Sequence, residues 1–121
     1  MNKIIIYSLD GCSYSQYAIN TLKYNNIDYQ VIHIDKDDKE YYKITHNINS
    51  FPHILYLNKN DDKYKIGGND DLNEIFKIIN DTKENTTDSK ALEKFNIMVD
   101  TIQSKLSLDK KTTLQLIDLL K

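Results

Sequence analysis

The sequence predicts an α/β fold, with a mixed four-stranded sheet flanked by helices and a helical hairpin at the C-terminus. Three observations support this prediction. Residues 3–9 form a β-branched run typical of a strand buried on both faces. A helical pattern and a second apolar segment follow, which together require a parallel crossover. Two short apolar segments joined by a turn come later, and such a hairpin is antiparallel.

Four segments have the composition of strands. The first lies close to the start of the chain, and we interpret it as a strand rather than a signal peptide because it lacks a cleavage pattern. Residues 60–62 are of types common in turns, and they separate the last two segments. The expected strands are residues 3–9, 29–35, 53–58 and 63–66.

Three helices are expected among these strands. Ser13 or Ser15 is expected to cap the first helix, whose apolar side includes Tyr17. Acidic residues at the start of the second helix interact favourably with the positive end of the helix dipole. Asp70 or Asp71 is expected to cap the third helix. The expected helices span residues 13–25, 37–47 and 70–80.

The last third of the chain predicts a separate helical extension, so that residues 1–82 form one domain and residues 83–121 form the extension. Residues 82–89 are polar and are expected to be a linker. Asp88 or Ser89 is expected to cap a helix that ends near residue 106. Ser107 or Asp109 is expected to cap a shorter helix that ends near residue 120.

Both C-terminal helices have an apolar side at the helical period. On the first helix these residues are Ala91, Leu92, Phe95, Met98, Val99, Ile102 and Leu106. On the second helix they are Thr113, Leu114, Leu116, Ile117 and Leu120. A hairpin of this size holds little core alone. We therefore expect it to pack within the chain, and the alternatives are a second copy or a partner protein.

Cys12 is the only cysteine in the chain and stands between the first strand and the first helix. Backbone N–H groups and the helix dipole stabilise a thiolate at such a junction. The alternative is a buried, inert thiol, which is common for a free cysteine. One cysteine excludes an intramolecular disulfide and fits the cytoplasm or another reducing compartment.

Two later segments strengthen the interpretation of Cys12 as a place for chemistry. The only proline follows Phe51, and two of the three glycines precede Asn69, Asp70 and Asp71. The structural alternatives are a loop proline before a strand, and a turn followed by a helix cap. Glycine also lets a ligand lie close to the backbone, and N–H groups at a helix start suit a carboxylate.

Residues 1 to about 82 resemble a glutaredoxin, a thioredoxin-fold enzyme that uses glutathione. Three segments carry the resemblance in the same order as in the family. They are Cys12-Ser13-Tyr14-Ser15, similar to Cys-x-Tyr-Cys or Cys-x-Tyr-Ser; Ser50-Phe51-Pro52, similar to Thr-Val-Pro; and Gly67-Gly68-Asn69-Asp70-Asp71-Leu72, similar to Gly-Gly-x-Asp-Asp.

The resemblance implies a glutathione-dependent thiol–disulfide oxidoreductase with Cys12 as its catalytic residue and a cis peptide bond before Pro52. It implies a monothiol mechanism, because Ser15 stands where a resolving cysteine stands in dithiol members. Residues implied to support the active site are Ser13, Tyr14 and Ser15. Residues implied to bind glutathione are Phe51, Pro52, Gly68, Asp70, Asp71 and, close to a family position, Lys39. The implied partners are glutathione and glutathionylated proteins.

One departure from the family pattern concerns Leu9, which stands where many members have a lysine that lowers the thiol pKa. The absence of this cation and the presence of Asp10 nearby both favour a higher thiol pKa. Lys39 is a candidate for compensation, and its alternative is a solvated surface lysine. The departure gives weight to a second reading, an interaction module with vestigial chemistry.

A third reading is a dimer that bridges a [2Fe–2S] cluster through two Cys12 thiolates and two glutathiones. The cluster-carrier branch usually has Cys-Gly-Phe-Ser, whereas this chain has Cys-Ser-Tyr-Ser, so we favour the oxidoreductase. We expect a monomer, or a dimer if a cluster is bridged or if the C-terminal helices pair. His33, His46 and His53 do not have the spacing of a metal site, and none is predicted.

Composition limits the other function classes. The net charge of −2 implies no broad basic field for nucleic acid. No run of about 18 apolar residues occurs, so no transmembrane helix is expected. All 16 basic residues are lysine, and Asn and Ile are abundant. This composition is typical of an AT-rich genome, so a large DNA virus is one candidate source.

Overall fold

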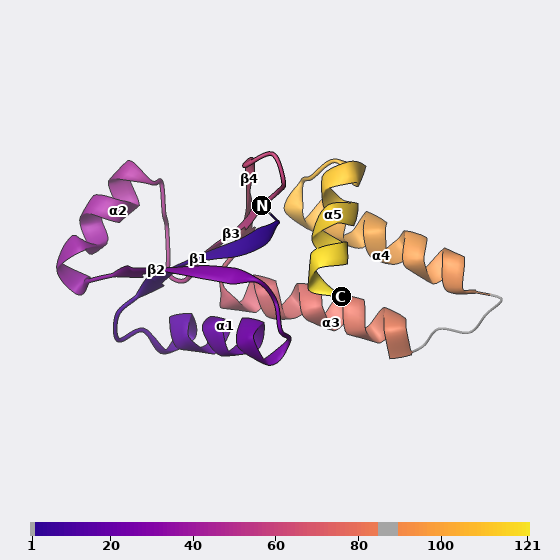
Figure 1. Cartoon of the computed structure of the whole chain (residues 1–121), viewed down its shortest axis with the longest axis horizontal. Helices are drawn as coiled ribbons and strands as arrows, with labels where there is room; N and C mark the ends of the chain where they lie inside the picture. Colours follow the sequence, from indigo (N-terminus) through magenta and orange to yellow (C-terminus); the bar gives the residue numbers. More distant parts are fainter. Residues whose placement is uncertain (1, 85–89) are drawn as a thin grey trace.

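The structure is a computed structural model that describes residues 2–84 and 90–121. Strands and helices are mixed along the chain up to α3, with β3 followed directly by β4, and the elements after α3 are helical (Figure 1). They are β1 (Lys3–Leu9), α1 (Ser13–Tyr24), β2 (Tyr29–Ile34), the 3₁₀ helix η1 (Lys36–Asp38), α2 (Lys39–Thr45), β3 (His53–Leu57), β4 (Lys63–Gly67), α3 (Asn69–Glu84), α4 (Ala91–Leu106) and α5 (Lys110–Leu120).

The four strands form one mixed sheet in the order β2-β1-β3-β4. β1 is parallel to β2 and antiparallel to β3, and β3 is antiparallel to β4. Ile6 at the centre of β1 is paired with Val31 on one side and Ile54 on the other. The predicted mixed sheet is therefore confirmed, as is the α/β architecture of a thioredoxin-like fold.

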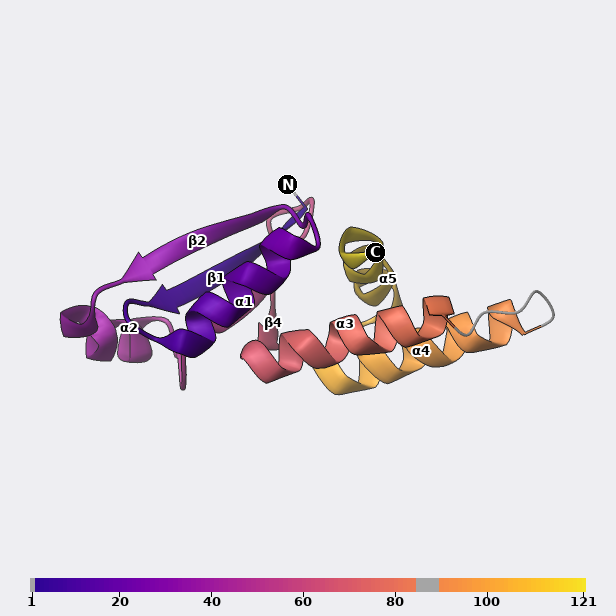
Figure 2. The ribbon, with the colours of Figure 1, turned by 90° about the horizontal axis from the view of Figure 1, so that it is seen from below.

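The sheet carries helices on both faces, because β1 alternates its side chains between two clusters of buried residues. Ile4 and Ile6 belong to the larger cluster, which also includes residues of α1 and α3. Ile5 and Tyr7 belong to the smaller cluster, which Tyr42 of α2 partly covers. Figure 2 shows α1 beside the sheet, with α3 continuing beyond it. β1 is thus buried on both faces, as its continuous apolar run predicts.

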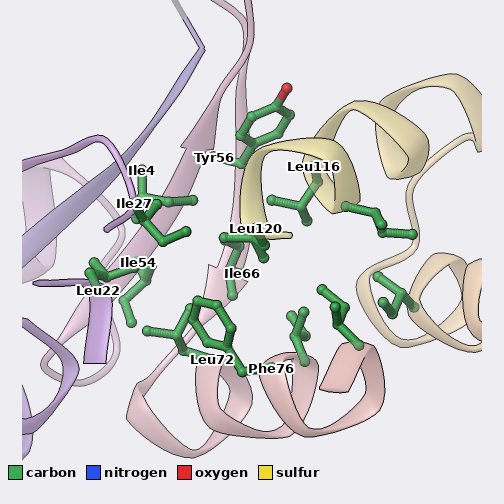
Figure 3. Close-up of a cluster of buried hydrophobic side chains, with 14 of the residues drawn as sticks. Ile4, Leu22, Ile27, Ile54, Tyr56, Ile66, Leu72, Phe76, Leu116 and Leu120 are labelled. Atoms are coloured by element: carbon green, nitrogen blue, oxygen red, sulfur yellow. The ribbon is translucent and has the colours of Figure 1, made fainter. Parts of the chain in front are cut away.

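The C-terminal helices pack on the rest of the chain. α4 lies alongside α3, and α5 folds back toward the edge of the sheet at β4 (Figures 1 and 2). Leu116 and Leu120 of α5 lie on the side facing Tyr56, Ile66 and Phe76 (Figure 3). All of these residues belong to the larger cluster. The expected packing within the chain is confirmed, and the helical extension shares one core with the sheet region.

The predicted caps of the first helix are wrong, since Cys12 is the N-cap residue of α1 and Ser13 begins the helix. For α4, the predicted caps Asp88 and Ser89 lie outside the described residues, and Lys90 holds the N-cap position. The prediction for α5 is correct for Asp109, whose carboxylate accepts a hydrogen bond of 2.7 Å from the Thr112 N–H.

The third helix is longer than predicted, because α3 continues through Glu84. Ile79 is buried in the larger cluster, and Thr82 donates its hydroxyl hydrogen bond to the Ile78 carbonyl, 3.0 Å away. Packing against α4 therefore extends the helix into the segment expected to be a linker, and the proposed boundary at residue 82 falls inside α3. The rest of that segment, 85–89, lies outside the described residues.

The second predicted helix begins instead as η1, where the Asp35 carboxylate accepts a hydrogen bond from the Asp37 N–H, and α2 ends at Thr45. Two residues expected on apolar sides are exposed: Tyr17 at 56% and Leu92 at 73%. Tyr17 falls outside the buried side of α1, which consists of Ser15, Ala18, Ile19 and Leu22. Leu92 lies in the first turn of α4, before the buried positions begin at Met98.

No helix among the described residues is both long and apolar enough to cross a membrane.

The shared core predicts that the C-terminal helices contribute to the stability of the whole chain. Ile102 of α4 is completely buried, so Ile102→Ala is expected to lower the free energy of unfolding by about 2–4 kcal/mol. Ile97→Ala on the same helix is the matched control, because Ile97 is 58% exposed and its loss changes stability by about 0.5 kcal/mol or less. Urea unfolding measures both. Equal, small effects would contradict the shared core.

Candidate active site

The backbone holds Cys12 at the start of α1. Gly11 has a φ of +79°, which favours glycine and turns the chain out of β1. The Cys12 N–H donates to the Leu9 carbonyl at 3.1 Å, and the Cys12 carbonyl accepts from the Gln16 N–H at 3.3 Å. The second of these bonds is the first of the helix, so the N–H groups of the first turn have no intrahelical acceptor. These donors face the sulfur end of Cys12.

The surroundings of Cys12 favour the thiolate. Partial burial opposes ionisation and would raise the pKa of the thiol. Hydrogen bonds from the Ser15 N–H, the Ser15 hydroxyl and the Tyr14 N–H, together with the charge of Lys39, outweigh that effect. The pKa of Cys12 is therefore lower than that of an ordinary thiol. Leu9, where a lysine was expected from the family pattern, does not prevent this shift.

Ser15 connects β1 to the thiol. Its side chain is 1% exposed, and its Oγ accepts a hydrogen bond of 3.3 Å from the Leu9 N–H. The same hydroxyl donates to the Cys12 sulfur. Ser15 was predicted to be a site residue, and in the structure it lowers the pKa of the Cys12 thiol.

The start of β3 lies against the thiol. The Phe51–Pro52 peptide bond is cis, as the resemblance implies. The Phe51 carbonyl oxygen lies 4.0 Å from the Cys12 sulfur, which donates to it as a thiol. Pro52 is buried, whereas Phe51 is half-buried and belongs to the edge of the smaller core cluster. The main chain at Phe51 is thus next to the atom that would react.

A hollow of about 260 Å³ opens beside Cys12 on the α2 side. Lys39 and Lys43, one helical turn apart on α2, both line it. Lys39 is the cation whose charge lowers the pKa of Cys12. The side chain of Lys36 lies against Gly11, about 3 Å from where a side chain there would begin. Three lysines of the η1–α2 segment therefore lie beside residues 9–12, where Leu9 stands in place of the lysine expected from the family pattern.

A second hollow, of about 270 Å³, opens on the α3 side of Phe51. Most of the predicted site residues meet here. Its lining consists of Tyr14, Ser50, Phe51, Pro52, Gly68, Asn69, Asp70 and Asp71. Ser50 and Phe51 also line the hollow beside Cys12, so the two hollows adjoin at these residues. The structure thus brings the three predicted segments together at two adjoining hollows, one of which Cys12 lines.

Asp71 has a capping role at the start of α3. The Gly68 carbonyl accepts the first hydrogen bond of the helix from the Leu72 N–H, and the Asp71 carboxylate accepts the Gly68 N–H at 2.8 Å. The predicted caps are therefore corrected, because Gly68 holds the N-cap position and Asp71 caps from the third helical position. A side chain at Gly67, whose φ is +127°, would collide with the Asp71 carboxylate.

Two predicted residues have weaker roles in this arrangement. Ser13 is exposed and is not among the groups that lower the pKa of Cys12. Tyr14 is 59% exposed and stacks edge-on against Tyr17, with ring centroids 6.3 Å apart. Tyr14 therefore forms an outer wall of the α3-side hollow rather than packing into the core.

Sequence reasoning missed three residues of the site. Lys43 follows Lys39 by one helical turn, and that spacing was a usable signal. Asn69 is buried and lines the α3-side hollow, and its side-chain oxygen, which is closed to solvent, has no hydrogen-bond partner among the described residues. Lys105 of α4 lies 3.4 Å from Asp71, and no local pattern indicated this contact.

Residues 4–59 match the family model described as Glutaredoxin. The match spans β1 to β3 and includes Cys12, Phe51 and Pro52, but it ends before β4 and the start of α3. This stretch of the chain is similar to glutaredoxins, which are thiol–disulfide oxidoreductases that typically use glutathione. No curated protein matches the chain.

Within residues 2–84 and 90–121, no three His, Cys, Asp or Glu side chains are grouped as they would be around a metal ion.

The role of Ser15 predicts a change in the ionisation of the thiol. Ser15→Ala removes the hydroxyl that donates to the sulfur, so the pKa of Cys12 is expected to rise. Alkylation by iodoacetamide increases with pH through the pKa of the thiol and then levels off. The variant is expected to react about two to ten times more slowly at neutral pH and to level off at a higher pH.

Ser13→Ala is the matched control for that experiment, because it removes an exposed hydroxyl from the same helical turn. Its alkylation profile is expected to follow the unmodified protein. An unchanged profile for Ser15→Ala would show that the Ser15 hydroxyl does not stabilise the thiolate.

Proposed function

We propose that this chain is a glutathione-dependent thiol–disulfide oxidoreductase that removes glutathione from protein mixed disulfides by a monothiol mechanism at Cys12. The observation that carries the proposal is the position of an activated thiol beside a cis Phe51–Pro52 peptide. The sulfur has a lowered pKa, and the Phe51 carbonyl lies 4.0 Å from it. The coarser activity, thiol–disulfide exchange, is the one typical of the matched family.

The two hollows suit the two ends of glutathione, which carries its thiol in the middle. The hollow with Lys39 and Lys43 offers positive charge for the glycyl carboxylate. The first turn of α3 offers N–H groups, at Asp70 and Asp71, for the γ-glutamyl carboxylate. The Asp71 carboxylate is an acceptor for the γ-glutamyl ammonium.

The main chain between these ends completes the binding site. Phe51 presents its N–H and carbonyl next to Cys12, where they pair with the cysteinyl backbone of glutathione like a short added strand. Gly68 lets the ligand approach the backbone, because a side chain there would begin 3.8 Å from the Pro52 carbonyl and narrow the α3-side hollow.

In the first step, the Cys12 thiolate attacks the glutathione sulfur of the mixed disulfide. A bond forms between the two sulfurs, and the bond between glutathione and the target sulfur breaks. The target leaves with the electron pair as a thiolate and takes a proton from water. The first-turn N–H groups and Ser15, which stabilised the Cys12 thiolate, hold the new disulfide at the same place.

In the second step, the thiolate of another glutathione attacks the glutathione sulfur attached to Cys12. Oxidised glutathione is released, and the electron pair of the broken bond returns to Cys12. The low pKa makes Cys12 a good leaving group in this step. Ser15 has no sulfur and cannot resolve the intermediate, so the second glutathione is required.

The proposal predicts turnover that depends on both Cys12 and glutathione. The assay follows oxidised glutathione formed from the mixed disulfide of glutathione and 2-hydroxyethanethiol. The unmodified protein is expected to catalyse the reaction, and Cys12→Ser is expected to have only the uncatalysed rate. Mass spectrometry of the protein after the first step is expected to show one glutathionyl group on Cys12.

Ser104→Ala, which alters an exposed side chain on α4, is the control for that assay and is expected to retain turnover. Absence of turnover and of the Cys12 adduct in the unmodified protein would contradict the oxidoreductase. If glutathione still bound, the vestigial interaction module or the bridged [2Fe–2S] cluster would take its place. A brown colour after anaerobic addition of iron and sulfide would distinguish the cluster from the module.

A further inference from the structure

The C-terminal extension reaches the candidate glutathione site through Lys105. The Lys105 Nζ lies 2.8 Å from a carboxylate oxygen of Glu74 and 3.4 Å from Oδ1 of Asp71. Both acids belong to the first half of α3, whereas Lys105 is near the end of α4. Because α4 runs alongside α3, as Figure 2 shows, the end of α4 lies near the start of α3.

This contact is well defined for a lysine at the surface. Its side chain is only 22% exposed, so its stem is packed while its ammonium group meets two carboxylates. Hydrogen bonds to Glu74 and Asp71 raise the pKa of Lys105, so its ammonium group keeps its charge. A fixed positive charge is therefore present at the γ-glutamyl end of the site.

Asp71 consequently has a partner on each of its oxygens. Oδ2 accepts the Gly68 N–H at 2.8 Å, and Oδ1 faces Lys105. In the proposed complex the same carboxylate receives the ammonium group of the γ-glutamyl residue. A second ammonium group at the Asp71 carboxylate would share oxygens that already accept hydrogen bonds. The positive charge of Lys105 would also repel it.

We propose that Lys105 is a specificity-determining residue that competes with the γ-glutamyl ammonium for Asp71 and so weakens the recognition of this end of glutathione. This inference rests on the proposed function. The site consequently discriminates less between glutathione and γ-glutamyl thiols whose amine is blocked. The helical extension is then part of the specificity of the site as well as part of the core.

The test compares Lys105→Met with the unmodified protein, because methionine retains an apolar stem and loses the charge. Transfer of the glutathionyl group to Cys12 is followed by mass spectrometry over a range of disulfide concentrations. One probe is the mixed disulfide of glutathione and 2-hydroxyethanethiol. The other is the same disulfide made with N-acetylglutathione, in which an amide replaces the ammonium.

With the glutathione probe, Lys105→Met is expected to lower the half-saturating concentration about two- to fivefold, as the loss of an exposed ion pair implies. The maximal rate is expected to stay unchanged, because Lys105 does not touch the sulfur. With the N-acetylated probe, the half-saturating concentration is expected to stay the same. Among the described residues, Glu74→Gln leaves Asp71 as the one carboxylate paired with Lys105, so it is expected to raise the half-saturating concentration for glutathione.

Lys94→Met is the matched control, because it removes the same charge from α4 about three turns away from Lys105. Circular dichroism and thermal unfolding check that each variant is folded. An equal shift with both probes would overturn the inference, since it would indicate a general change in the site. A higher half-saturating concentration in Lys105→Met would also overturn it, because Lys105 would then bind the γ-glutamyl carboxylate.

No shift in Lys105→Met, with normal turnover by the unmodified protein, would overturn the inference and leave the proposed function in place. Lys105 would then only join α4 to α3. Absence of the Cys12 adduct in the unmodified protein would instead overturn the proposed function and this inference together.

Discussion

The antiparallel pairing of β1 with β3 is the constraint on which the rest of the site depends. Tyr7 is paired with His53, so the residues that leave the end of β1 lie beside the residues that enter the start of β3. Cys12 and Phe51 meet for this reason, although they are 39 positions apart in the chain. A shift of one position would also reverse the two faces of β1, and burial on both faces therefore fixes the register. Core packing thus determines the geometry of the thiol and its peptide neighbour.

Given this position, the lowered pKa of Cys12 comes from several local groups rather than from one dedicated cation. Burial alone would suppress the thiolate, and the hydrogen-bond donors at Tyr14 and Ser15 counter it. Ser15 contributes twice, first through its backbone N–H and then through its hydroxyl, whose oxygen also accepts a hydrogen bond from the Leu9 N–H. The charge of Lys39 adds to these bonds. The motif position at Leu9 is therefore free to be apolar, which explains how a departure from the family pattern is compatible with an activated thiol.

The sequence was a good guide to features that depend on local pattern. It predicted the four strands and the mixed sheet, because periodicity and turn residues carry that information, whereas the resemblance to glutaredoxins implied the cis bond at Pro52. It was a poor guide to helix ends: neither serine caps α1, since the backbone at Cys12 starts the helix, and α3 extends to Glu84 because α4 covers Ile79. It also missed Lys105, whose contact depends on how two distant helices align and has no signature along the chain.

The alignment of α4 with α3 also gives the helical extension a physical connection to the chemistry. Burial of Met98, Val99 and Ile102 fixes how far α4 is displaced along α3, and this displacement decides which side chain of α4 meets Asp71. Asp71 in turn holds the Gly68 N–H and thereby shapes the turn that leads into α3. A movement of α4 along α3 would alter both the charge beside Asp71 and the backbone beside Pro52. The core that stabilises the extension is therefore the same structure that sets the electrostatics at one end of the candidate site.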